Sequence, residues 1–151
     1  MTEFRFLHLE RRRIDQALPD ILDEALAAGW RVVIQAGSEE RVEALNERLW
    51  TYADESFLPH GSAHDGEPHA QPIYLTAGGD NPNGARLRML LSGVAAAAFV
   101  EAGYERVVLL FDGRDEEAVA EARRQWTEVK ASGGAPSYWR EADDGGWTRV
   151  R

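Results

Sequence analysis

Short apolar runs alternate with helical patterns along this chain, and this alternation limits the possible folds more than any other feature. Residues 4–9, 31–36 and 106–111 are rich in β-branched or aromatic side chains, which is typical of buried strands. A stretch with apolar residues at helical spacing follows each run, over 14–28, after Gly37-Ser38, and from 115 to about 131. This order indicates a three-layer α/β/α sandwich with a mostly parallel, Rossmann-like sheet.

The remaining segments give weaker signals. We expect strands at 72–76 and 86–91, a short helix at 95–102, and a polar connection over 53–71 that is longer than most loops. Residues 135–151 predict a C-terminal hairpin or a loose extension. No repeat or linker interrupts the sequence, so we interpret 1–151 as a single domain.

Composition excludes several classes of site. The 151 residues include 17 Lys and Arg against 26 Asp and Glu, a formal net charge of −9. This balance disfavours a surface that binds nucleic acid phosphates directly, because such binding depends on Lys and Arg displacing counterions. The chain has no cysteine, so thiolate metal sites, iron–sulfur clusters and thiol nucleophiles are excluded. The longest apolar run, 94–100, is far too short to span a bilayer, and we expect a cytoplasmic protein without membrane contact.

Two positions could serve a small α/β hydrolase or nucleotide-binding enzyme. The turn at Gly37-Ser38 precedes a helix, where N–H groups favour anions, but it lacks both glycine-rich phosphate-binding motifs and is followed by two acids. We therefore predict an ordinary helix cap. Asp112 ends the strongest strand, yet no nucleophile or partner base accompanies it, so a turn-capping residue is the favoured interpretation.

Three histidines in the long connection raise the question of a metal. His60, His64 and His69, with Asp65 and Glu67 between them, offer imidazole and carboxylate ligands. Their spacing matches no established metal-binding pattern. We expect a solvated loop with no metal and no cofactor.

The last helix bears a candidate docking site. Val119, Arg123, Trp126 and Lys130 are spaced at +4, +3 and +4 and so form one row. The row borders an expected core stripe of Ala118, Ala122 and Val129. An indole between two cations suits a partner that offers an apolar side chain beside carboxylates. The alternative is that Trp126 is a core residue and that the cations only complement the helix dipole.

A second apolar cluster lies at the end of the second helix and in the loop that follows. Leu49, Trp50, Phe57 and Pro59 bring several large side chains to a place where not all of them can reach the core easily. They predict either a protein-protein patch or a satellite cluster beneath the long connection.

A family resemblance is carried by the N-terminal strand and helix, by segments 29–34, 45–50 and 55–60, and by the final helix with Ala122, Arg123 and Trp126. In these parts the sequence resembles the chi subunits of the bacterial DNA polymerase III holoenzyme. Chi proteins are non-enzymatic three-layer α/β proteins without a working nucleotide site. They join the psi subunit, and through it the clamp loader, and they bind the acidic, phenylalanine-ending C-terminal tail of single-stranded DNA-binding protein (SSB).

The resemblance also implies site residues. The tail site falls on Arg123 and Trp126, with Lys130 and Val119 beside them, and Trp126 replaces a tyrosine usual in better-known members. The surface facing psi, or another clamp-loader component, would include Trp50, Phe57 and Pro59 together with Leu49. DNA would then be reached only through SSB. A rival hypothesis is direct binding of single-stranded DNA, with Trp126, Trp139 and Trp147 as stacking platforms.

Overall fold

We describe residues 2–50, 60–62, 67–91 and 94–151 of a computed structural model. The strands are β1 (Glu3–Leu9), β2 (Val32–Gln35), β3 (His60–Ser62), β4 (Ile73–Thr76), β5 (Leu87–Leu90), β6 (Arg106–Asp112), β7 (Ala135–Glu141) and β8 (Trp147–Arg149). The helices are α1 (Ile14–Ala27), α2 (Glu39–Trp50) and α3 (Glu116–Ala131), with short 3-10 helices η2 (Pro68–Ala70) and η3 (Ala96–Phe99).

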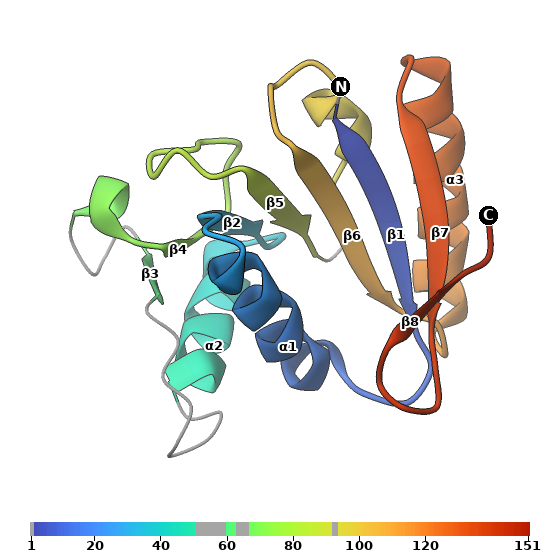
Figure 1. The fold of residues 1–151 in the computed structure, drawn as a ribbon, viewed down its shortest axis with the longest axis horizontal. Coiled ribbons are helices and arrows are strands. Elements are labelled where there is room, and N and C mark those ends of the chain that lie inside the picture. Colours follow the sequence, from blue (N-terminus) through green and yellow to red (C-terminus); the bar gives the residue numbers. More distant parts are fainter. Residues whose placement is uncertain (1, 51–59, 63–66, 92–93) are drawn as a thin grey trace.

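All eight described strands form one sheet in the order β3-β4-β2-β5-β6-β1-β7-β8. Neighbouring strands run parallel except for β7 and β8, which are antiparallel. Helices α1 and α2 lie on one face towards the β2 end, and α3 lies on the other face behind β1, β6 and β7 (Figure 1). This arrangement confirms the predicted three-layer α/β sandwich with a mostly parallel sheet.

The central strands β2, β4, β5 and β6 are buried on both faces over most of their length, because alternate side chains enter two different cores. In β1, Leu7 and Leu9 pack on the side of α1 and α2, whereas Phe4 and Phe6 pack on the side of α3. This double burial explains why the central strands appear in the sequence as continuous apolar runs. None of the described helices is both long and apolar enough to cross a membrane.

Local signals place the helix boundaries where the sequence predicts them. Gly29 follows α1 with φ of 81°, a left-handed conformation that glycine adopts without strain. The carboxylate of Asp115 caps α3 by accepting hydrogen bonds from the N–H groups of Glu117 and Ala118. The side-chain oxygen of Ser38 accepts one from the N–H of Arg41 at 3.2 Å, which confirms the predicted cap of α2.

Three segments differ from the expectations. The connection over 53–71 contains β3 and η2, and β3 has only three residues, too few for any alternation to be recognised. The expected helix at 95–102 is a 3-10 helix of four residues. The 135–151 segment is a hairpin and not a loose extension, and its first strand joins the main sheet beside β1.

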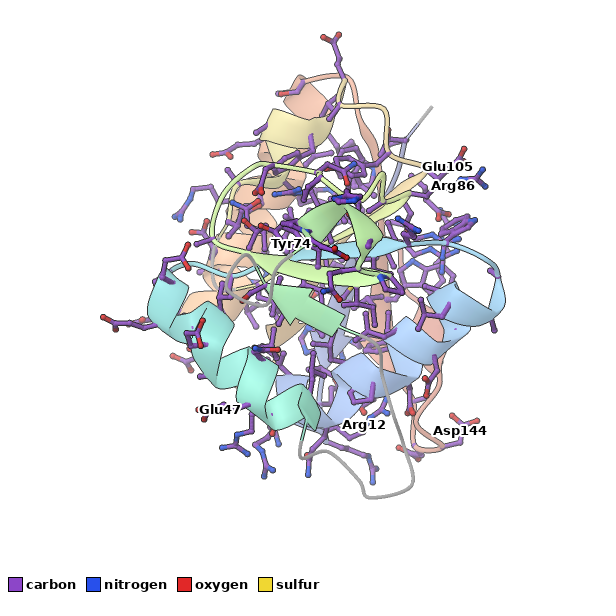
Figure 2. All side chains as sticks on the ribbon, turned by 90° about the vertical axis from the view of Figure 1, so that its left-hand side faces the viewer. Arg12, Glu47, Tyr74, Arg86, Glu105 and Asp144 are labelled. Carbon is purple, nitrogen blue, oxygen red and sulfur yellow. The ribbon has the colours of Figure 1, made fainter. Side chains whose placement is uncertain are left out.

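A buried carboxylate fastens this hairpin to the loop between β1 and α1. One oxygen of Glu141 accepts the N–H groups of Glu10, Arg11 and Arg12 at 3.0, 2.7 and 3.1 Å. Its other oxygen accepts Arg12 Nε at 2.5 Å, and Arg12 also donates to Gly145 O at 2.8 Å. Figure 2 shows Arg12 next to the turn that bears Asp144. Burial alone raises the pKa of Glu141, but these hydrogen bonds outweigh it and lower the pKa to about 2.

Candidate functional site

The row predicted on the last helix lies along one flank of α3. The buried residues of α3 are Ala122, Gln125 and Val129. Ala122 and Val129 belong to the expected core stripe, whereas Ala118 is only half-buried and Gln125 was not expected in the core. Gln125 is tolerated there because its side-chain oxygen accepts the N–H of Ala96 at 2.8 Å. We refer to Val119, Arg123, Trp126 and Lys130 together as the tail site, after the role that the family resemblance predicts for them.

Trp126 lies between the core and the surface. Its ring meets Phe6 edge-on at 5.5 Å between centroids, and Tyr138 at 6.2 Å. The guanidinium of Arg151 lies 5.3 Å from its ring centroid. Trp126 remains partly exposed. The indole is therefore fixed by the core on one side and can still contact a partner on the other.

The cations of the tail site are exposed. Among the described residues, neither Arg123 nor Lys130 forms a side-chain ion pair, whereas the neighbouring Arg124 pairs with Glu121. Val119 is half-buried against the α3-side core. An unpaired guanidinium beside an anchored indole can bind a carboxylate and an apolar ring at the same time.

Strand β7 supplies a second wall that sequence reasoning missed. The register pairs Phe6 with Tyr138 and His8 with Arg140, so both β7 side chains point towards α3. The Tyr138 hydroxyl lies 2.6 Å from His8 Nδ1, and Arg140 forms an ion pair with Glu10 at 3.3 Å. Tyr138 and Arg140 alternate with Trp139, and this period of two is the signal that could have revealed the strand.

His8 is buried beneath the site. Its ring meets Phe111 edge-on at 5.3 Å. Burial lowers the pKa of His8, and the positive charge of Arg140 lowers it further, against smaller opposing effects of the Glu10 and Asp112 carboxylates. The imidazole is therefore mainly neutral at pH 7, and the site's positive charge comes from its arginines and lysine.

The second predicted cluster is mostly outside the described residues. Leu49 is 2% exposed and packs within the core beside α1 and α2, so its side chain does not form part of an exposed surface. Trp50 ends α2, and nothing is described of its side chain. Phe57 and Pro59 lie outside the described residues.

The possible catalytic and metal residues have ordinary roles where they can be seen. A hydrogen bond from Arg114 lowers the pKa of Asp112, and the Arg114 N–H also donates to it at 2.9 Å, so Asp112 caps a turn as predicted. No group of three or more potential metal ligands occurs in the described part of the chain. His60 belongs to β3 and His69 to η2, and His64 lies outside the described residues.

The three tryptophans proposed as a stacking platform do not share a surface. Trp126 packs against the core on the α3 side, whereas Trp139 and Trp147 pack against the core on the α1 side. The sheet separates them, so they cannot stack successive bases of one strand.

Comparison with known proteins gives a family match and two named relatives. The sequence matches the family described as DNA polymerase III chi subunit, HolC, over residues 1–137. One relative, a probable DNA polymerase III subunit chi of Rickettsia prowazekii (strain Madrid E), is 28% identical over 117 residues, which cover 74% of this chain and 71% of that protein. Another, the DNA polymerase III subunit chi of Escherichia coli (strain K12), is 32% identical over 62 residues, which cover 41% of this chain and 42% of that protein. The family match confirms the resemblance seen in the sequence, and the chain belongs to the DNA polymerase III chi subunit family.

Proposed function

We propose that this chain is a non-catalytic adaptor in DNA replication that binds the C-terminal tail of SSB through the tail site. The observation that carries the proposal is the exposed guanidinium of Arg123, without an ion pair among the described residues, beside the half-buried indole of Trp126. The acidic, phenylalanine-ending tail implied by the family resemblance offers a carboxylate and an aromatic ring to these two groups.

In this mechanism each residue has a separate task. The terminal carboxylate of the tail accepts hydrogen bonds from Arg123, and its phenyl ring packs against Trp126 and the methyl groups of Val119. Lys130 attracts the acidic residues that precede the phenylalanine. One short peptide in one pocket binds with a Kd of roughly 1 μM, or about −8 kcal/mol, and many tails on a coated strand raise the effective affinity.

A second surface would connect the chain to the clamp loader. The resemblance assigns Trp50, Phe57 and Pro59 to the surface that binds psi or an equivalent component. The chain would then work in the cytoplasm and contact DNA only through SSB, in accord with its charge of −9.

Calorimetry with a synthetic SSB tail peptide tests this proposal. We expect Arg123→Ala to weaken binding at least about tenfold, since a hydrogen bond to a charged group contributes roughly 1.5–3 kcal/mol. Arg124→Ala is the matched control, because its side chain is also exposed on α3 but is paired with Glu121. A peptide that lacks the final phenylalanine should bind weakly to wild type and to Arg124→Ala. Equal binding by the two variants would remove the proposed site.

A further inference from the structure

The opposite face of β1, β6 and β7 bears an open groove that the proposed function does not use. Helix α1 covers the adjoining part of the sheet and forms one wall, and the β7–β8 hairpin forms the other (Figure 1). The groove has a volume of about 490 Å³. Six of its lining residues define what we term the tryptophan groove: Arg5, Leu7, Trp30, Arg106, Trp139 and Trp147.

Arginine and tryptophan side chains are stacked along this groove. The guanidinium of Arg5 lies 4.9 Å from the ring centroid of Trp139, and that of Arg106 lies 5.1 Å from the ring centroid of Trp30. A third guanidinium, that of Arg149, lies 5.9 Å from the Trp139 ring. Each contact holds a long cationic side chain in place over an aromatic face, so the positive groups are preorganised.

The two arginines of the groove share one carboxylate. Arg5 Nε and Arg106 Nε both bond the same oxygen of Glu3, at 3.0 and 2.6 Å. Neither arginine forms an ion pair with a second carboxylate among the described residues. Among the described residues that line the groove, Glu24 on the α1 wall is the one carboxylate, against the two guanidinium groups of Arg5 and Arg106. Arg149 lies outside this lining and donates to Arg151 O at 3.2 Å.

We propose that the tryptophan groove binds an acidic peptide segment that bears an aromatic or aliphatic side chain. The carboxylates of such a segment would accept the remaining N–H groups of Arg5 and Arg106. Its apolar side chain would pack against Trp147 and the floor formed by Leu7. The segment needs no free C-terminal carboxylate, which separates this site chemically from the tail site.

Nucleic acid fits the same groove less well. The guanidinium groups of Arg5 and Arg106 already cover faces of Trp139 and Trp30, which leaves less ring surface for bases to stack on. In addition, part of the groove lies outside the family match. Trp139 and Trp147 come after residues 1–137, which match the chi family.

The direct test is an NMR titration of the full chain with the peptide Ac-Asp-Glu-Phe-Asp-Glu-Leu-NH2, blocked at both ends. The indole N–H signals are assigned by single Trp→Phe substitutions. We expect the signals of Trp30, Trp139 and Trp147 to shift on binding while that of Trp126 stays in place. A shift confined to Trp126, or no shift at millimolar peptide, would overturn the proposal.

Variants then separate this groove from the tail site. Arg106→Gln should weaken binding of the blocked peptide at least about tenfold and leave binding of the SSB tail, which has a free C-terminus, unchanged. Arg123→Ala should have the reverse effect, so failure of one proposal does not imply failure of the other. Trp147→Ala serves as a second groove variant if Arg106→Gln does not fold. Unchanged binding in a folded groove variant, or tighter binding of an oligothymidylate than of the blocked peptide, would refute the assignment.

Discussion

Replacement of Glu141 by glutamine should detach the C-terminal hairpin partially and make the stability of the chain less dependent on pH. The side chain of Glu141 is 1% exposed and accepts four hydrogen bonds, three from backbone N–H groups and one from Arg12. A glutamine of the same shape keeps one acceptor oxygen but turns an NH2 group towards the guanidinium. Arg12 retains Asp20 and Gly145 as partners, so the variant still folds.

The magnitude follows from the pKa. A fall from the ordinary 4.5 to about 2 corresponds to about 3 kcal/mol of preference for the ionised carboxylate in the folded state. Arg12 is 23% exposed, so solvent screening reduces the expected loss in Glu141→Gln to about 2 kcal/mol at pH 7. In a chain of this length, a loss of that size lowers Tm by roughly 4–8 °C.

The pH dependence gives the sharper measurement. Because the folded-state pKa lies below the unfolded value, the stabilisation is complete above pH 4.5 and disappears as the pH falls through about 2. Urea unfolding, followed by circular dichroism from pH 7 to pH 3, should show the difference between wild type and Glu141→Gln falling to about half or less. Glu128→Gln, on the exposed face of α3, is the control and should match wild type throughout. A difference that is constant across this pH range would refute the role assigned to the ionised carboxylate.

Substitutions at three further positions test other parts of the structure. Arg88→Met should lower the free energy of unfolding in urea by roughly 3–5 kcal/mol. Arg88 is fully buried, and its loss leaves polar partners unsatisfied. A decrease below about 1 kcal/mol would contradict this prediction. Gly113→Ala should displace the His8 ring beneath the tail site, because a Cβ at this position would overlap the imidazole. An unchanged His8 signal in NMR would contradict this prediction. In calorimetry, Trp126→Tyr should bind the SSB tail with an affinity within about threefold of wild type, whereas Trp126→Ala should bind it at least about tenfold more weakly. Equal affinities of these two variants would show that the site needs no aromatic ring.

The parts of the fold that could be predicted are those with local causes. Gly29 and Asp115 mark helix boundaries through their own backbone conformation and side-chain chemistry, and double burial makes β6 a continuous apolar run. The position of β7 was not predictable in this way. Its place beside β1 depends on pairing between residues about 130 positions apart, and the proline at its start and its polar residues weaken the strand signal.

The candidate site was predictable only for the residues that share one helix. A spacing of three and four residues brings Arg123 and Trp126 to one flank of α3 without knowledge of the rest of the fold. Tyr138 and Arg140 join them through strand pairing, and His8 through its position in β1. Leu49 shows why an exposed patch is hard to predict from sequence. A large apolar residue at the end of a helix can belong to a surface patch or to the core, and Leu49 is buried in the core.

The hairpin gives the two proposed sites a common structural dependence. Successive side chains of β7 point to opposite faces, so Tyr138 and Arg140 form a wall of the tail site while Trp139 lies in the tryptophan groove. Glu141, the next residue, fastens the same strand to the loop before α1. A variant that loosens this attachment should therefore weaken both kinds of peptide, whereas Arg123→Ala and Arg106→Gln should each weaken one. If Glu141→Gln lowers stability but leaves the affinities for both peptides unchanged, neither peptide needs the β7 side chains. Tyr138, Trp139 and Arg140 would then not belong to the two binding sites.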